Sequence, residues 1–219
     1  MNVLGCVVTA VVAYLLGSIP AGYLVGKARG LDIRTVGSGN IGATNVFRIL
    51  GRTAGIVVLV VDGLKGWAAA AWLPDLVHQC LAPSEAWDLQ TQEYSRIIAG
   101  VIVILGHNYT CWLKFKGGKG IATSAGVLAA LVPLTFVIGL IVWIVVCLTT
   151  RYVSVASMAA AAVLPLATWG VGYSNRMIVI TAVVGALAIY KHKANIQRLL
   201  KGAENKIGGK KNPPGGAVP

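Results

Sequence analysis

Residues 121–149 read IATSAGVLAALVPLTFVIGLIVWIVVCLT, and the way this apolar run folds decides how often the chain crosses a membrane. A bilayer-spanning helix needs about 20 apolar residues, so the run is too long for one comfortable span. Pro133 lies near its middle, where a proline ring breaks the hydrogen-bond ladder of a helix. The run is therefore either one long helix or two short helices that meet at Pro133.

Five other runs are apolar and close to the length of a span: Val3–Leu24, Thr53–Leu73, Ile97–Leu113, Val153–Trp169 and Met177–Tyr190. Of the 219 residues, 56% are hydrophobic and 12% are charged, whereas a soluble domain carries about 25% charged residues. So much apolar surface excludes a disordered chain. The 27 glycines show no triplet repeat and the 4 cysteines are scattered, which predicts neither a structural metal nor an obligatory disulfide. The composition predicts an all-α integral membrane protein.

The charges between the apolar runs indicate which side each loop faces. Residues 27–52 hold five basic residues against one acidic residue, residues 114–119 hold three lysines, and the segment from Lys191 onward is strongly basic. Residues 74–96 hold four acidic residues and one arginine. Basic loops are cytoplasmic, and the carboxyl-terminal segment returns to that side only if residues 121–149 form two helices. About seven transmembrane helices are predicted, with the amino terminus outside and the carboxyl terminus cytoplasmic.

The domain organisation expected from this pattern is simple. Residues 1–207 form a single transmembrane domain. Residues 208–219, GGKKNPPGGAVP, are rich in turn-forming residues and predict a flexible cytoplasmic tail.

The first of three glycine-rich, basic segments on the predicted cytoplasmic side is GSGNIGATNVFR at residues 37–48. Its three glycines let the backbone curl so that successive N–H groups point at an anion. Arg48 supplies a bidentate group for phosphate. Further hydrogen bonds are available from Ser38, Asn40, Thr44 and Asn45. The alternative is a flexible loop between helices, but such a loop has no need of this ordered polar pattern, and the segment favours a phosphate site.

The second segment is GHNY at residues 106–109, followed by FKGGKGIAT at residues 115–123. It resembles a phosphate loop, but Gly120 stands where a Walker A sequence needs Ser or Thr for magnesium. Nucleotide hydrolysis is therefore not expected. Gly118 and Gly120 let the backbone approach an anion at a helix start, and Lys119 supplies a point charge. The alternative is an anchor on the basic side of the membrane, which is the preferred interpretation for Lys114.

The third segment is KHKANIQRLL at residues 191–200, followed by KGAE up to Glu204. On one continuous helix, His192, Asn195 and Leu199 share a face. The basic residues of this segment have an alternative role as contacts for anionic lipid headgroups. That role does not explain His192 and Asn195, which add nothing to lipid electrostatics at neutral pH.

Asp62 and Lys65 lie three residues apart inside the second apolar run. Ionisable residues inside a span are costly and usually face the interior of the bundle. A structural ion pair is the favoured interpretation, and the alternative is a lysine that reaches the membrane surface.

Many cations and few bases suit a phosphorylated substrate. The candidate bases are Asp32, Glu204, His107 and His192, with Asp62 inside a span. Neither the HxxxxD pair of coenzyme-A-dependent glycerolipid acyltransferases nor a G-x-S-x-G nucleophile elbow occurs in the sequence, which argues against a covalent acyl-enzyme. Two alternatives remain open: a transporter of phosphorylated solutes, which would use broken helices at membrane depth, and a scaffold that only binds lipid headgroups.

In order and spacing, the three segments resemble the three motifs of the bacterial acyl-phosphate:glycerol-3-phosphate acyltransferases, the PlsY family. The resemblance covers nearly the whole chain up to about Gly208. Thr110 stands where the family commonly has proline, which affects a local turn. Lys191 stands where arginine is usual, which keeps the charge but loses the planar fork.

The resemblance implies transfer of a fatty acyl group from acyl phosphate to the 1-hydroxyl of sn-glycerol 3-phosphate. The products would be lysophosphatidic acid and phosphate, in phospholipid biosynthesis at the cytoplasmic side of the bacterial inner membrane. Membrane lipids and the soluble enzyme that makes acyl phosphate are the expected partners. No cofactor, metal or nucleic acid is implied.

The resemblance also suggests a role for each motif residue. On this hypothesis Ser38, the amides around Gly39 and Gly42, and Lys119 hold the acyl phosphate. Arg48, His192 and Asn195 hold the glycerol 3-phosphate, and the departing phosphate is a candidate acceptor for the hydroxyl proton. Thr44 and Asn45 shape the floor of the site, and His107 is either a base or a structural hydrogen-bonding group. The other expected binding residues are Asn40, Gly118, Gly120 and Glu204.

Overall fold

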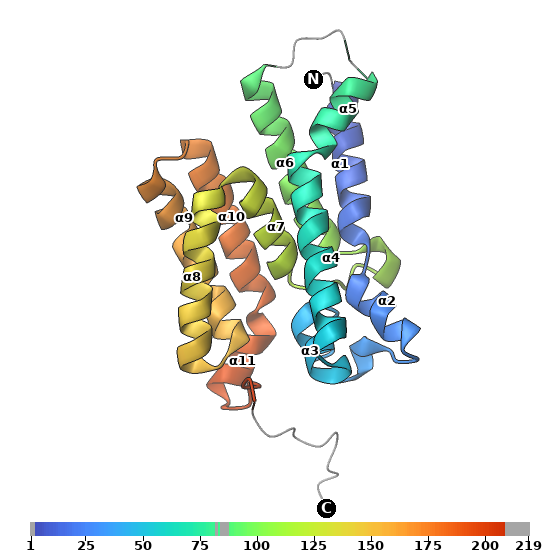
Figure 1. Ribbon diagram of the computed structural model, residues 1–219, viewed down its shortest axis with the longest axis vertical. Helices are drawn as coiled ribbons and strands as arrows, with labels where there is room; N and C mark the ends of the chain where they lie inside the picture. The colour runs from blue at the N-terminus through green and yellow to red at the C-terminus, as the bar shows by residue number, and fades with distance from the viewer. Residues whose placement is uncertain (1–2, 82, 84–87, 209–219) are drawn as a thin grey trace, which may run out of the picture.

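The computed structural model describes residues 3–81, 83 and 88–208, and over these residues the chain is a bundle of helices without strands (Figure 1). In chain order the α-helices are α1 (Val3–Ser18), α2 (Ala21–Ala28), α3 (Ala43–Leu50), α4 (Arg52–Ala71), α5 (Leu73–Leu81), α6 (Leu89–Asn108), α7 (Ile121–Leu131), α8 (Pro133–Thr150), α9 (Val153–Val171), α10 (Asn175–Lys191) and α11 (Lys193–Leu200). Two short 3-10 helices, Ile33–Thr35 and Cys111–Leu113, lie in the loops. The predicted tail falls almost wholly outside the described residues.

The apolar run at residues 121–149 forms two helices that meet at Pro133, as predicted. α7 ends at Leu131, and Pro133 is the first residue of α8, where a helix makes no use of the missing N–H. Within the described part of the chain, five candidate spans are long and apolar enough to cross a membrane, or six if α10 and α11 count as one bent span. α7 is a shorter apolar helix of 11 residues. These spans indicate a multi-pass membrane protein. The total of seven transmembrane helices and the side of the membrane that each terminus faces stay predictions.

Four details differ from the expectation, each for a local reason. The run Val3–Leu24 lies within one candidate span, Val3–Ala28, but its helix is broken between α1 and α2, because Pro20 cannot continue the ladder of α1. The span expected at Ile97–Leu113 ends at Leu113 but begins earlier, at Leu89, and α6 itself ends at Asn108. The polar segment expected as a loop contains α5. His192 does not share one continuous helix with Asn195, because the axis bends by 53° between α10 and α11.

Glycines set how closely the helices pack. A Cβ on Gly66 of α4 would lie 2.1 Å from the carbonyl oxygen of Thr123 in α7, and one on Gly126 would lie 1.9 Å from that of Gly63. A Cβ on Gly17 of α1 would similarly meet the carbonyl oxygen of Val103 in α6. Such close backbone approach is the usual way for helices to associate in lipid, where apolar surface gives no preference for protein over membrane.

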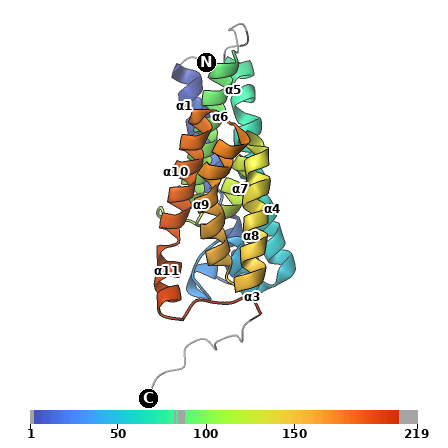
Figure 2. The ribbon, with the colours of Figure 1, turned by 90° about the vertical axis from the view of Figure 1, so that its left-hand side faces the viewer.

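The helices form two packed groups. α4 packs on α7 and α1 on α6, whereas α8 and α10 both pack on α9. α3 and α11 lie together at one end of the bundle, and α5 lies at the opposite end (Figures 1 and 2). The three glycine-rich segments converge on the end where α3 and α11 lie.

Candidate active site

A cavity of about 330 Å³ brings the three segments together. Its polar wall combines residues from widely separated parts of the sequence: Ser38, Asn40, Gly42, Thr44, Asn45, Arg48, Asp62, His107, Lys119, Gly120, Ser154, His192, Asn195, Arg198 and Glu204. The volume is in the range of small-molecule sites. A smaller cavity of about 150 Å³ shares Ser38, Asn40, Lys119, Asn195 and Arg198 and adds Gly117, Gly118 and Lys191.

Asn45 organises the first segment from inside. It lies on α3, is 2% exposed, and its Nδ2 donates to the carbonyl oxygens of Ile33, Val36 and Asn40 at 3.0–3.2 Å. Its Oδ1 accepts from the backbone N–H of Ser38 at 2.9 Å. The amide is fully used by the chain, so Asn45 holds the loop in place and is not a direct phosphate ligand in this arrangement.

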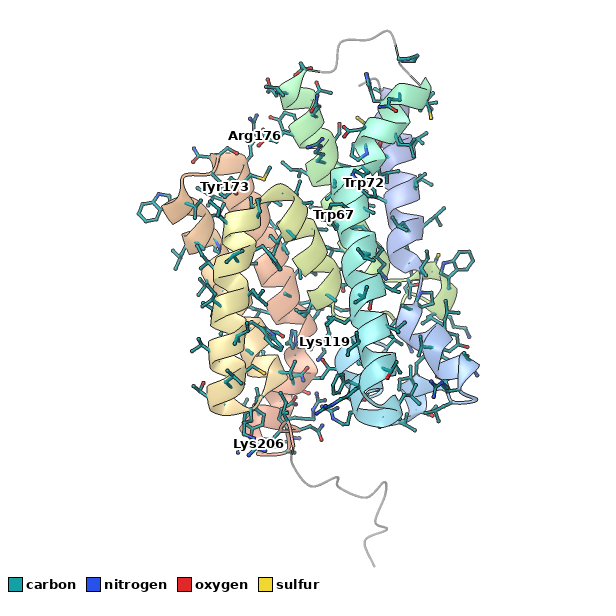
Figure 3. The ribbon with its side chains drawn as sticks, in the orientation of Figure 1. Trp67, Trp72, Lys119, Tyr173, Arg176 and Lys206 are labelled. Carbon is teal, nitrogen blue, oxygen red and sulfur yellow. The ribbon has the colours of Figure 1, made fainter. Side chains whose placement is uncertain are left out.

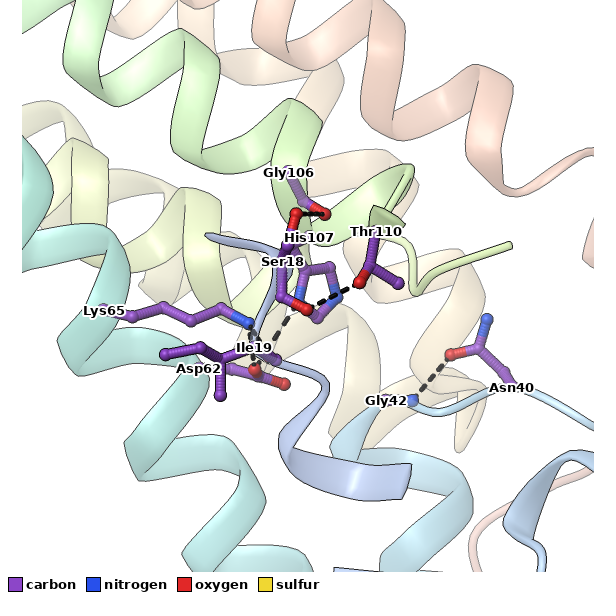
Figure 4. Close-up of polar contacts among 9 residues, drawn as sticks. All are labelled: Ser18, Ile19, Asn40, Gly42, Asp62, Lys65, Gly106, His107 and Thr110. Carbon is purple, nitrogen blue, oxygen red and sulfur yellow. Dashed lines mark hydrogen bonds and ion pairs between the residues drawn. The ribbon is translucent and has the colours of Figure 1, made fainter. Parts of the chain in front are cut away.

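The predicted nest of free amides around Gly39 and Gly42 is not formed. The N–H of Gly39 donates to the carbonyl of Val36 at 3.0 Å, and the N–H of Gly42 donates to Asn40 Oδ1 at 2.8 Å (Figure 4). Gly39 also lines neither cavity. Ala43 and Thr44, in the first turn of α3, line the cavity, and the first turn of a helix leaves N–H groups without helical partners and favours an anion through its dipole.

Arg48 lies in the last turn of α3 and not at the end of a loop. Its half-buried guanidinium lines the cavity and has no ion-pair partner among the described residues. Burial lowers the pKa of Arg48, Glu204 opposes that shift, and Arg198 adds to it. An arginine remains charged under such conditions, so this side chain offers an unoccupied fork for a phosphate.

Lys119, Asn195 and Glu204 form a chain of hydrogen bonds across the cavity wall. Lys119 Nζ donates to Asn195 Oδ1, and Asn195 Nδ2 donates to Glu204 Oε1 at 2.8 Å. Glu204 also accepts from Arg198 Nε at 2.8 Å and from Ser154 Oγ at 3.1 Å. Glu204 therefore fixes residues from α9 and α11 together. Asn195, expected as a direct ligand, has both polar atoms engaged and holds the ammonium of Lys119.

The ammonium of Lys119 is the group most affected by this environment. Its pKa is lowered to about 8, first by burial and then by the nearby Arg198 and Arg48, while Glu204 opposes the shift. Three cations gathered around one carboxylate leave an excess of positive charge, which an anionic substrate would neutralise. Figure 3 shows Lys119 between the two groups of helices, well away from Trp72 and Arg176 at the opposite end.

His192 and Lys191 lie where α10 gives way to α11. His192 is 3% exposed, lines the cavity, and its Nδ1 lies 2.8 Å from the carbonyl oxygen of Ala188. A carbonyl can only accept, so Nδ1 is assigned the proton and a neutral ring has Nε2 as its acceptor. Lys191, the departure from arginine, donates to the carbonyl of Asn108 at 3.1 Å and lies over the ring of Tyr109.

The glycines of the second segment pack against the end of α6. The N–H groups of Gly117 and Gly118 donate to the carbonyls of Asn108 and His107. A Cβ on Gly118 would lie 2.1 Å from His107 Nε2, so only glycine lets the loop lie against this ring. The predicted ion pair is confirmed: Lys65 Nζ lies 2.7 Å from Asp62 Oδ1, and both side chains are buried.

The rest of the cavity wall is mainly apolar and was not identified from the sequence. Its apolar residues come from α4, α7, α8, α9 and α10: Leu59, Ile121, Ala125, Leu128, Phe136, Leu140, Trp143, Ala160, Ala161, Leu164, Val184 and Ala188. Leu128 and Leu164 also belong to a buried cluster with Ile97, Val132 and Met177, which closes the far end. Arg198 and Ser154 were missed as well. Their positions in the sequence do not mark them as site residues, because it is their hydrogen bonds to Glu204 in the folded protein that bring them to the cavity.

Fold and site together define a multi-pass helical membrane protein whose cavity is cationic at one end and apolar at the other. The sequence model of the family described as glycerol-3-phosphate acyltransferase matches residues 7–202. The chain belongs to that family.

Named relatives and solved structures agree with this membership. The glycerol-3-phosphate acyltransferase of Geotalea daltonii is 44% identical over 91% of this chain and 96% of its own length. Glycerol-3-phosphate acyltransferase 1 of Rhizobium johnstonii is 42% identical over 92% and 91%. Crystal structures of PlsY (YgiH), an integral membrane glycerol 3-phosphate acyltransferase, match with TM-scores of 0.79 for the glycerol 3-phosphate form and 0.77 for the lysophosphatidic acid form. They are 39% and 38% identical, each over 92% of this chain and 95% of the solved chain.

Proposed function

We propose that this protein transfers a fatty acyl group from acyl phosphate to the 1-hydroxyl of sn-glycerol 3-phosphate, releasing lysophosphatidic acid and phosphate. The observation that carries the proposal is that one cavity combines three features: cations that suit phosphate, a histidine whose Nε2 is free, and an apolar extension that suits an acyl chain. The family relationship supports glycerol 3-phosphate as acceptor, since relatives carry that substrate in their names. The acyl phosphate donor is proposed from the resemblance of the three motifs to those of the PlsY family, and the excess of cations in the cavity is consistent with it.

Two phosphates are needed at once, and the wall offers cations on two sides. On one side lie Arg48 and the first turn of α3. On the other side lie Lys119 and Arg198, which are held by Asn195 and Glu204. We assign Arg48 and His192 to the glycerol 3-phosphate, and Lys119 with Ser38 to the acyl phosphate. Asn40, Asn45, Asn195 and Glu204 then act by holding these groups, through the hydrogen bonds described above.

The reaction needs no covalent acyl-enzyme. The 1-hydroxyl oxygen attacks the acyl carbonyl carbon, the new ester C–O bond forms, and the bond between that carbon and the phosphate oxygen breaks. The electron pair leaves with the phosphate, whose added negative charge is stabilised by Lys119. The hydroxyl proton passes to the departing phosphate or, within the site, to Nε2 of His192, which is the free acceptor of that ring.

The acyl chain is assigned to the apolar part of the cavity. From Ser154, which contacts Glu204, to Leu164 at the far end is ten residues of α9, or about 15 Å of helix. That is half of a hydrocarbon core about 30 Å thick, so the chain would stay within one leaflet. Leu59 of α4 and Leu140 of α8 line the cavity yet are 52% and 42% exposed, and they mark a side opening towards the lipid.

We further propose that residues 1–207 form one catalytic domain that crosses the bacterial inner membrane seven times, with the site on the cytoplasmic side. The basic segments supply the orientation. Cys80 in α5 is free and exposed and lies in the acidic segment expected outside. In intact cells, a membrane-impermeant maleimide should label Cys80 but not a Cys80→Ser variant. Labelling only after the membrane is permeabilised would reverse the orientation.

The test of the function uses purified protein in lipid with glycerol 3-phosphate and palmitoyl phosphate, and palmitoyl-coenzyme A as the rival donor. Equal amounts of phosphate and lysophosphatidic acid from acyl phosphate alone are expected. Activity with the thioester alone would keep the acyltransferase and remove the donor assignment. No transfer from either donor by folded protein would contradict the proposal and favour a transporter of phosphorylated solutes.

A further inference from the structure

Asp62, Lys65 and His107 form a buried polar cluster that the proposed reaction leaves without a role. They are 2%, 5% and 5% exposed and lie on two different helices. Asp62 Oδ1 lies 2.7 Å from Lys65 Nζ and 3.4 Å from His107 Nδ1 (Figure 4). Buried ionisable groups of this kind are expensive to keep in a membrane protein and are expected to serve a function.

One side of the cluster is tied to the break between α1 and α2. Lys65 Nζ donates to the carbonyl oxygen of Ile19 at 2.8 Å. The neighbouring carbonyl of Ser18 accepts from the hydroxyl of Thr110 at 2.6 Å, and Ser18 Oγ donates to the carbonyl of Gly106 at 3.3 Å. A proline at position 110 has no hydroxyl, so this chain gains a bond at that departure from the family pattern. The end of α6 is therefore anchored from two directions.

The other side of the cluster contacts the phosphate loop. The ring of His107 is directed at Gly118, because a Cβ there would fall 2.1 Å from Nε2. The carbonyl of the same histidine accepts from the N–H of Gly118 at 3.1 Å. Gly118 immediately precedes Lys119, so the orientation of this ring bears directly on where the catalytic ammonium lies.

We propose that Asp62 and Lys65 act as positioning residues, which hold His107 as a wedge against Gly118 and thereby keep Lys119 buried beside Asn195. This inference rests on the proposed function. The Asp62 carboxylate lies 3.4 Å from Nδ1 of the ring, and Lys65 neutralises that carboxylate and ties it to the α1–α2 break. None of the three needs to touch the substrate for this effect.

The first test replaces the charged pair together, Asp62→Asn with Lys65→Met. Removing one partner would leave an uncompensated buried charge, whereas removing both keeps the site neutral. We expect a folded enzyme whose kcat/KM for acyl phosphate falls at least tenfold. In the profile of kcat/KM against pH, the midpoint of the fall on the alkaline side should also move from near 8 towards the ordinary pKa of lysine, because a released loop exposes Lys119 to water. General destabilisation would not move that limb.

The matched control is Asp75→Asn with Arg96→Met. This pair joins α5 and α6 at the opposite end of the bundle, with 2.9 Å between Arg96 Nη2 and Asp75 Oδ2. Both kcat/KM and the alkaline midpoint should stay at the wild-type values. A wild type inactive with every donor would refute the proposed function. If the wild type is active and the folded Asp62→Asn/Lys65→Met enzyme has the same kcat/KM and the same alkaline midpoint, the inference is refuted while the proposed function stands.

A steric test gives an answer even if the charge variant does not fold. Gly118→Ala places a methyl group into the His107 ring and should reduce kcat/KM by tenfold or more. His107→Ala removes the ring and should also lower kcat/KM, because nothing then holds the loop against the end of α6. Adding Gly118→Ala to His107→Ala should cause little further loss, since the methyl group no longer meets a ring. Full activity of either single variant would show that the ring does not act as a wedge on this loop.

Discussion

The pH dependence of Lys119 offers a direct test of how the site holds phosphate. The pKa of this lysine is lowered to about 8 by burial and by neighbouring arginines. Only the protonated form binds an anion, so activity carried by this charge is present below that pKa and is lost as pH rises through it. One unit above the pKa about 10% of the ammonium remains, and kcat/KM should then fall roughly tenfold per pH unit.

Lys119→Arg is the informative substitution because it keeps the charge and removes the titration. An arginine stays protonated beyond pH 12, so the variant should lose its alkaline limb between pH 7 and 9.5 even though its absolute rate falls. Lys119→Met removes the charge and should cost about 100-fold to 1000-fold in kcat, as expected for one donor to a developing negative charge.

The assay is phosphate release from palmitoyl phosphate at saturating glycerol 3-phosphate, with kcat/KM measured against pH, since this ratio reports the free enzyme. Lys116→Arg is the matched control, because Lys116 is exposed and lines neither cavity. An alkaline limb that persists unchanged in Lys119→Arg would refute the reasoning, since another group would then be responsible for it.

Three further outcomes are expected. Arg48→Ala should lower transfer by at least 100-fold with a melting temperature near that of the wild type, because its guanidinium has no ion-pair partner among the described residues to lose; turnover close to normal would remove it from the site. Glu204→Gln should lower kcat/KM about tenfold, because its amide nitrogen cannot accept from Arg198, and an unchanged rate would contradict the anchoring role. Ala160→Leu fills the cavity one helical turn, about 5.4 Å, before Leu164. The preferred acyl phosphate should then be about four carbons shorter, which a competition among acyl phosphates of different chain lengths would measure. The control Gly170→Leu enters open space and should leave the preference unchanged, and an unchanged preference in Ala160→Leu would show that the acyl chain lies elsewhere.

Much of the fold could be predicted because the membrane imposes strong rules on a sequence. The lengths of the apolar runs predicted which segments form membrane-spanning helices, and the position of Pro133 predicted where the longest run divides. The boundaries that failed depended on short-range competition: Pro20 ends α1, and α5 forms in a segment whose charges resemble those of a loop. Composition alone does not resolve such cases, because the hydrogen bonds that satisfy a helix end come from distant residues.

The sequence by itself determined the class of protein, the three segments and the kind of group they suit, because run lengths, net charge and residue types can be read without knowing which residues meet in space. Only the tertiary structure decided which of those groups are available. Asn45 and the amides of Gly39 and Gly42 are occupied by their own loop, while Arg48 has no ion-pair partner among the described residues. The tertiary structure also decided the apolar part of the cavity, which five helices build together. Hydrogen bonds and close approaches between distant residues leave no regular spacing in a sequence, and these contacts determine which of the polar groups remain free to bind a substrate.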